Sequence, residues 1–281
     1  MRSLTVCILS LYAASGLLVG CEVPYDLDVA QTPEKIVIEG LVTDNPSHQC
    51  IKISRSVNFY DTGKTPRVTN AVVSVSDELG NVFGFVHNPN NHPDSAGYYV
   101  PAAPFSGTVG RTYYLRAEVD GVLFEAREKL EPALSMDSLS YRVDPEEKEN
   151  PDEMGRFYEV LLFAREPRDQ RNFYLFKFFR NDTLALANDT DIYFSDDELL
   201  AENIDGVPAP VYFKKNDSAR VEMYSISRVA YVYYSDLWAL LNNDAGGMFG
   251  PIPSSPRTNL SNGALGFFQV SAVNISGIKI E

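Results

Sequence analysis

The sequence predicts a mainly β protein: an immunoglobulin-like or prealbumin-like β-sandwich, followed by a larger antiparallel β domain with one packed amphipathic helix. Three observations predict it. Short runs of alternating apolar and polar residues recur in the first half, turn residues separate them, and the chain has 16 Tyr and 16 Phe but one Trp. Aromatic and β-branched residues suit a pleated, half-buried surface, and many short strands between turns favour a sandwich.

The start of the chain has the pattern of a lipoprotein export signal. Arg2 gives it a positive end, residues 4–18 are apolar, and LVGC at residues 18–21 resembles a bacterial lipobox. In a lipobox the thiol of Cys21 is acylated and becomes the new N-terminus, so residues 1–20 are expected to be removed. Because the apolar run is shorter than the roughly 20 residues of a spanning helix, lipid on Cys21 is the expected membrane anchor.

Two segments follow the expected anchor. Residues 21–34 are polar, acidic and contain proline, which indicates a tether between lipid and fold. Residues 35–130 are expected to form the sandwich, with its clearest alternation in the apolar positions Tyr113, Leu115, Ala117 and Val119. Asp120-Gly121 then leads into another alternating run, and a two-residue Asp-Gly link of this kind is a strong hairpin signal.

The second domain is expected over residues 135–281. Two nearly continuous apolar runs, residues 157–164 and 173–179, predict central strands covered on both faces. The polar segment 165–172 between them predicts a hairpin loop, and the acidic segment 144–153 predicts a loop because it is poor in apolar residues.

One amphipathic helix is expected near residues 228–242. Its apolar positions recur with the spacing of one helix face: Ala230, Tyr233, Tyr234, Leu237, Trp238 and Leu241. Asn and Gly residues after it are typical of a helix end.

The segment after the helix, residues 246–262, is the expected partner-docking loop. Long loops in compact domains are usually functional or disordered, and Met248, Phe249 and Ile252 place apolar side chains among its glycines and prolines. The alternative is that these side chains fold back over the sheet beside Trp238.

Composition and motifs argue against several functions. The formal net charge of −14 disfavours nucleic acid as a partner, and the chain has no HExxH, GxSxG, P-loop or dinucleotide fingerprint. We expect no catalytic residues, no metal and no cofactor. A zinc site at His87, His92 and Asp94 is a weaker alternative, because these residues are expected in a flexible loop tip, where such side chains are more often solvated. Calcium at residues 188–191 or 195–198 is another, because a turn and a helix cap explain these acidic residues without a metal.

Four tripeptides have the Asp-Ser/Thr-apolar form of Bacteroidota O-glycosylation sites. Their candidate acceptors, expected on exposed loops, are Ser95, Ser138, Thr183 and Ser218.

Several motifs together carry a family resemblance. Besides the lipobox they are VIEGLVTD at residues 37–44, AVVSVSDELG at 71–80, GYYVPAAPFSGTVGRTYYLRAEVDG at 97–121 and PRTNLSNGALGFFQVS at 256–271. The sequence resembles a Bacteroidota lipoprotein family known as domain of unknown function 4249 (DUF4249) over essentially the whole mature chain. The resemblance implies an outer-membrane lipoprotein commonly associated with TonB-dependent transporters, and it transfers no catalytic residues.

We therefore expect a non-enzymatic, lipid-anchored outer-membrane protein that is an accessory or binding partner of a TonB-dependent barrel. The alternatives are a stand-alone lipoprotein that binds peptide or glycan, and a structural or adhesive surface protein. Glu22, Asp26 and Asp28 weakly resemble a surface-export signal and equally fit a solvated tether, so the periplasmic or surface face stays open.

Overall fold

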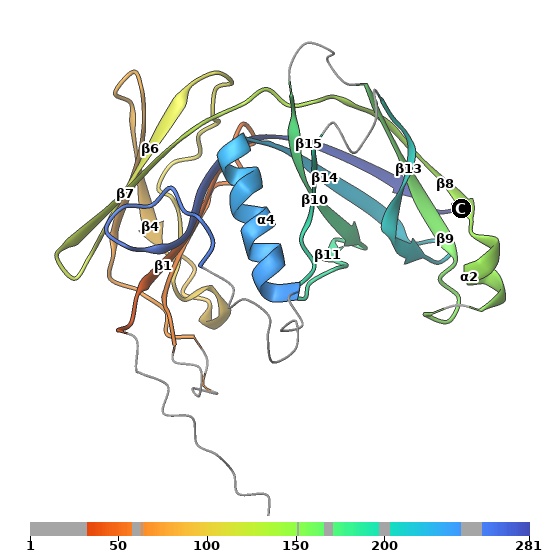
Figure 1. Ribbon diagram of the computed structural model, residues 1–281, viewed down its shortest axis with the longest axis horizontal. Coiled ribbons are helices and arrows are strands. Elements are labelled where there is room, and N and C mark those ends of the chain that lie inside the picture. Colours follow the sequence, from red (N-terminus) through yellow and green to blue (C-terminus); the bar gives the residue numbers. More distant parts are fainter. Residues whose placement is uncertain are drawn as a thin grey trace, which may run out of the picture. The chain divides into compact units, whose positions relative to one another are not determined.

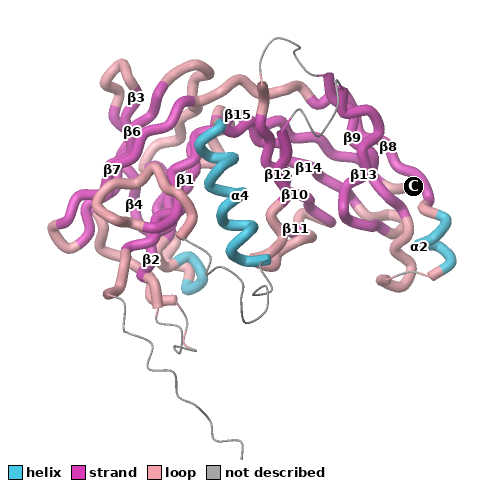
Figure 2. Tube along the Cα trace, viewed as in Figure 1, coloured by secondary structure: helices cyan, strands magenta, loops and turns pink. Residues whose placement is uncertain are grey.

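The computed structural model describes residues 33–57, 63, 65–150, 152–165, 171–196, 203–242 and 255–281. Residues 34–281 form one compact unit, in which strands dominate (Figures 1 and 2). The described helices are the 3-10 helix η2 (Pro93–Ser95), α2 (Pro145–Glu149) and α4 (Arg228–Asn242). The described strands are β1 (Ile36–Thr43), β2 (Cys50–Arg55), β3 (Val72–Asp77), β4 (Val82–His87), β5 (Tyr98–Pro101), β6 (Thr112–Val119), β7 (Val122–Lys129), β8 (Met136–Val143), β9 (Tyr158–Arg165), β10 (Phe173–Arg180), β11 (Thr183–Leu184), β12 (Tyr193–Asp196), β13 (Asn203–Phe213), β14 (Ser218–Ile226) and β15 (Leu265–Lys279).

The predicted fold class is confirmed. The described strands form two sheets in a sandwich-like layout, and α4 is the one long helix among them. The larger sheet has the order β11-β10-β14-β15-β1-β2-β5-β4-β3-β6-β7, with β12 also paired to β10. The smaller sheet has the order β13-β9-β8.

The last strand, β15, joins the two halves of the larger sheet. Its first half pairs in parallel with β1, from Leu265 opposite Val37 to Ser271 opposite Thr43. Its second half pairs antiparallel with β14, from Ala272 opposite Ser225 to Lys279 opposite Ser218. Figure 1 shows this strand running from beside β1 toward β14.

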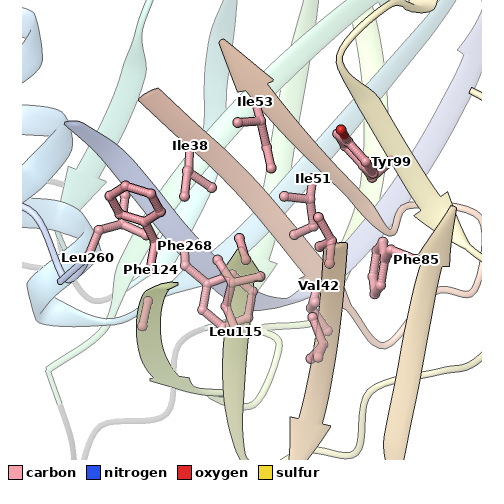
Figure 3. Packing of buried hydrophobic residues seen from close by; sticks show 14 of the residues in the cluster. Ile38, Val42, Ile51, Ile53, Phe85, Tyr99, Leu115, Phe124, Leu260 and Phe268 are labelled. Atoms are coloured by element: carbon pink, nitrogen blue, oxygen red, sulfur yellow. The ribbon is translucent and has the colours of Figure 1, made fainter. Parts of the chain in front are cut away.

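The core of the N-terminal half includes residues from the C-terminal end of the chain. Figure 3 shows Leu260 and Phe268 beside residues of β1, β2, β6 and β7. Phe268 is 0% exposed, as are Ile38, Ile51 and Leu115. The predicted division into residues 35–130 and 135–281 stays a prediction, since separate hydrophobic cores exist but one sheet runs through both halves.

The hairpin predicted at Asp120-Gly121 is confirmed. β6 buries every second residue, the predicted set Tyr113, Leu115, Ala117 and Val119. Val119 lies opposite Val122 across the turn, and Asp120 and Gly121 have φ angles of 51° and 79°. Two consecutive left-handed residues match the twist of the flanking strands.

The hairpin loop predicted at residues 165–172 is wrong. β9 lies between β8 and β13 in the smaller sheet, whereas β10 pairs with β14 and β12 in the larger one. β9 and β10 each pair with other strands. Two apolar runs that follow each other in the sequence therefore need not pair with each other.

The loop predicted at residues 144–153 is wrong in part, because α2 lies within it. The Asp144 side chain accepts hydrogen bonds from the backbone N–H groups of Glu146 (2.8 Å) and Glu147 (3.3 Å), which caps the helix. Pro145 at the first helical position and acidic residues in the first turn also favour a helix start.

Helix α4 packs one face on the larger sheet, as the apolar spacing predicts. Ala230 and Tyr233 are buried in a cluster with Phe173, Tyr224 and Phe267. Side chains near the C-terminal end of the helix are more exposed: Trp238 is 46% exposed and Leu241 38% exposed. None of the helices that the structure describes has the length and apolarity to cross a membrane.

Candidate functional site

A cavity of about 830 Å³ lies between α4 and the larger sheet. Its wall includes Leu237, Leu240 and Leu241 of α4, strands β1, β2 and β10, and residues 184–193. A smaller cavity of about 280 Å³ adjoins it. Both are lined by six of the same residues, namely Glu39, Lys52, Lys177, Tyr233, Tyr234 and Leu237.

Strand register places the cavity residues of the sheet in rows. Glu39 of β1 lies opposite Lys52 of β2 on one side and Phe267 of β15 on the other. Lys52 in turn lies opposite Tyr98 of β5. Because side chains alternate between the faces of a strand, these residues project away from the sandwich core that Ile38 and Ile51 fill.

The charge of Lys52 is compensated by its cross-strand neighbours. Its Nζ lies 2.5 Å from Oε2 of Glu39 and 5.9 Å from the centre of the Tyr98 ring. A cross-strand pair of opposite charges at this distance is favourable but, being partly exposed, modest in energy.

The helix contributes two tyrosines to the cavity wall. The Tyr234 hydroxyl donates a hydrogen bond of 2.5 Å to Oε1 of Gln269, and the Tyr233 ring stacks on Phe267 with centroids 5.0 Å apart. Burial raises the pKa of Tyr233 to about 12, with Glu39 adding to the effect, and burial likewise raises the pKa of Tyr234. Both hydroxyls are therefore protonated at neutral pH.

Lys177 is the cation that β10 brings to the cavity. It lies opposite Glu222 of β14 in the strand register, and its Nζ is 5.2 Å from the centre of the Tyr224 ring. Burial lowers the pKa of Lys177, and the negative charge of Glu222 opposes that effect. In the part of the chain that the structure describes, Lys177 forms no ion pair.

Glu222 is already occupied by other partners. It is 3% exposed, forms an ion pair with Arg220, and accepts a hydrogen bond of 2.7 Å from the Tyr224 hydroxyl. His48 Nε2 lies 3.3 Å from its Oε1, which links the β1–β2 loop to β14. A carboxylate with these partners is a structural group of the sheet.

Cys50 also lines the smaller cavity. Burial raises the pKa of its thiol to about 11, and the nearby lysines Lys52 and Lys177 only partly offset this. The thiolate is the nucleophilic form of cysteine, so at neutral pH this side chain is a neutral part of the wall.

The predicted docking loop is only partly within the described residues. Cys21, Met248, Phe249 and Ile252 lie outside them. Residues 255–262 of the loop are described, and Ser255 and Pro256, together with Leu241 of α4, line the larger cavity. Arg257 Nε and Nη2 donate to the Asp236 carboxylate at 2.7 and 2.8 Å, which connects the described part of the loop to α4.

The four candidate glycosylation residues lie on different elements, and their modification stays a prediction. Ser138, Thr183 and Ser218 are exposed, whereas Ser95 at the end of η2 is half-buried. Three of the four belong to strands (β8, β11 and β14) rather than to the loops that were expected.

Of the residues considered as metal ligands, Asp197 and Glu198 lie outside the described ones, whereas His87 and Asp191 have hydrogen-bond partners. His87 Nε2 accepts a hydrogen bond of 2.9 Å from the Gly97 N–H, and Asn188 donates to Asp191 within a turn. Among the described residues, no three or more His, Cys, Asp or Glu side chains are grouped to hold a metal.

The cavity residues were missed at the sequence level. The sequence did contain an indication for Lys177, because this lysine interrupts the apolar run FYLFKFF. A lysine within a buried strand is costly and is a candidate functional residue. Glu39 and Lys52 had no such indication, since their pairing depends on the register of β1 with β2.

Comparison with known proteins places the chain among related sequences. A family model described as Domain of unknown function (DUF4249) matches residues 22–275. No curated protein matches the sequence.

Proposed function

Because the chain belongs to the DUF4249 family, we propose a function that joins its lipobox to its cavity. The protein is a non-enzymatic, lipid-anchored protein of the outer membrane that binds a small ligand between α4 and the larger sheet. It acts as an accessory of a TonB-dependent transporter.

The single observation that carries ligand binding is the cavity of about 830 Å³. Its volume lies in the range of about 300–1,000 Å³ typical of ligand sites. Its wall combines apolar side chains with a few charged and hydroxyl groups held in place by strand register, stacking and hydrogen bonds. That combination provides both contact area and orientation for a ligand.

The non-enzymatic part of the proposal is supported by the protonation of the cavity groups. The pKa of Cys50 is raised to about 11 and that of Tyr233 to about 12, in both cases by burial first. A nucleophile or general base works best with a pKa near the ambient pH, so these groups favour binding over bond chemistry.

The location and the partner are supported by sequence. The lipobox ending at Cys21 supports a lipid anchor, and the family resemblance supports the outer membrane and a TonB-dependent barrel. Ser255 and Pro256, in the described part of the docking loop, line the larger cavity, so a partner that contacts them would be close to a bound ligand.

Native mass spectrometry of the lipidated protein, released from outer membranes in mild detergent, tests ligand binding. We expect a bound small molecule on the wild-type protein and its loss from Leu237→Trp, which adds bulk at a residue lining both cavities. Ala239→Trp places the same ring on an exposed part of the same helix and is the matched control. Equal retention by Leu237→Trp and the control would contradict binding in the cavity.

Affinity purification of the same lipidated protein tests the transporter partnership. We expect a TonB-dependent barrel, identified by its peptides, to copurify under gentle detergent conditions. A protein that retains its ligand but recovers no such barrel would support the stand-alone binding alternative instead.

A further inference from the structure

Lys177 is a partly buried cation of the cavity wall that forms no ion pair among the described residues, whereas Arg67, which also lines the larger cavity, is exposed. The Lys52 ammonium is paired with Glu39 at 2.5 Å, and Glu222 is paired with Arg220. Lys177 forms no such ion pair among the described residues. Its Nζ instead lies over the Tyr224 ring, 5.2 Å from the ring centre.

Such a lysine is costly to keep in place. Burial of its ammonium without an ion pair disfavours the charged form. Burial accordingly lowers the pKa of Lys177. The Tyr224 ring offers a cation–π contact, but a ring provides no acceptor for the three N–H donors of the ammonium. An anion from outside the chain would supply both a charge and an acceptor.

The rest of the wall describes the body of such an anion. Both cavities are lined by Lys177, and around it the larger cavity presents aliphatic and aromatic side chains, among them Leu175, Phe176, Leu186, Leu237, Leu241 and Leu265. An apolar ligand body is stabilised against these side chains by removal of its surface from water.

We propose that Lys177 binds the carboxylate of a monoanionic ligand whose apolar body lies along α4 and the residue 184–193 segment. This assignment rests on the proposed function, because it names the class of ligand that the cavity takes. The carboxylate belongs to the C-terminus of a short hydrophobic peptide or to an acyl chain.

The surrounding charges favour a single negative charge on the ligand. Glu39 and Glu222 both interact electrostatically with Lys177. A monoanion compensates Lys177 and adds no excess charge, whereas the second charge of a phosphate monoester would face these two carboxylates. In a partly desolvated site, like charges repel strongly.

Isothermal titration calorimetry of the full lipidated chain in nanodiscs tests the assignment. The probes are N-acetyl-Leu-Ala-Leu as its free acid and as its amide, and octanoate against octanamide, with empty nanodiscs as the blank. We expect the acids to bind and each amide to bind more weakly by about tenfold or more, the ratio expected for loss of a hydrogen bond to a charged group.

Variants of the chain separate Lys177 from general electrostatics. Lys177→Met keeps the length of the side chain without its charge and is expected to abolish the acid-over-amide preference. Lys177→Arg is expected to restore most of it. Lys215→Met removes an exposed lysine of the β13–β14 turn, outside both cavities, and is expected to keep the wild-type preference.

Every outcome decides the assignment. Preference for the peptide acid or for octanoate identifies which source of carboxylate fits. Equal binding of acid and amide, an unchanged preference in Lys177→Met, or no binding of either acid would overturn the role of Lys177. The proposal that the cavity binds a ligand would still stand if a copurified molecule were present on the wild-type protein and absent from Leu237→Trp. The test therefore distinguishes failure of the Lys177 assignment from failure of ligand binding.

Discussion

Replacement of Phe268 by alanine removes a C-terminal side chain from the core of the N-terminal half. Phe268 is 0% exposed and lies on β15 opposite Gly40. A Cβ at Gly40 would lie only 2.7 Å from Cδ2 of Phe268, so the ring fills the space above this glycine. Core Phe→Ala substitutions cost about 3–5 kcal/mol, and we expect the upper part of this range because strand pairing on both sides of Gly40 limits collapse of the cavity.

Urea unfolding of the full chain measures this loss with two probes. Far-UV circular dichroism follows the sheets, and the fluorescence of Trp238, the one tryptophan of the chain, follows α4. We expect both midpoints to fall together, since β15 belongs to both halves of the sheet. Val72→Ala is the control, because Val72 is 72% exposed and surface substitutions usually change stability by less than about 0.5 kcal/mol. A loss below about 1 kcal/mol, or an unchanged Trp238 transition, would refute the shared core.

Three further predictions test other parts of the fold. Gly266→Ala should destabilise the chain by more than about 3 kcal/mol, because Gly266 has a φ of 93° and a Cβ there would lie 2.2 Å from the Ile38 carbonyl oxygen; a melting temperature equal to wild type would disprove the close approach. Asp77 is buried, which raises its pKa, but hydrogen bonds from Asn81, Leu79 and Arg111 outweigh burial and lower the pKa below its ordinary value of 3.8. The stabilisation that ionised Asp77 contributes is therefore present above pH 3.8 and is lost as the pH falls below that value. Asp77→Asn should remove this acid-dependent loss of unfolding free energy. An unchanged loss, measured by chemical denaturation at each pH, would contradict the lowered pKa of Asp77. Cys50, whose pKa is raised to about 11, should react slowly with iodoacetamide at pH 7 and steadily faster as the pH approaches 11, as mass spectrometry can follow; rapid labelling at pH 7 would contradict its burial.

The strands could be predicted where alternation is strict and turns are explicit. β6 and the Asp120-Gly121 turn carry their side-chain faces and their hairpin geometry in the local sequence. α4 likewise follows from apolar residues at helical spacing. These are local patterns, and local physics decides them.

The pairing of distant strands could not be predicted. β1 and β15 are separated by most of the chain, and parallel pairing leaves no turn signal between them. The apolar runs of β9 and β10 are equally compatible with pairing to each other, yet they lie in different sheets. Periodicity indicates that a strand is buried but not which strand covers it.

The candidate site depends on the same nonlocal pairing. Lys177, Glu39 and Lys52 line one cavity because β14 and β1 flank the two halves of β15, β10 pairs with β14, and β2 pairs with β1. Sequence alone indicated instead the apolar residues of the docking loop, and two described residues of that loop, Ser255 and Pro256, do line the larger cavity. The nearest sequence signal for the cavity was a lysine within an apolar strand.

A crystal structure of the chain with a bromine-labelled peptide acid, N-acetyl-Leu-(4-bromo-Phe)-Leu, tests the central claim most directly. The account predicts anomalous bromine signal between α4 and β10 and the terminal carboxylate within hydrogen-bond distance of the Lys177 ammonium. Bromine bound elsewhere, or a carboxylate that faces solvent away from Lys177, would contradict it.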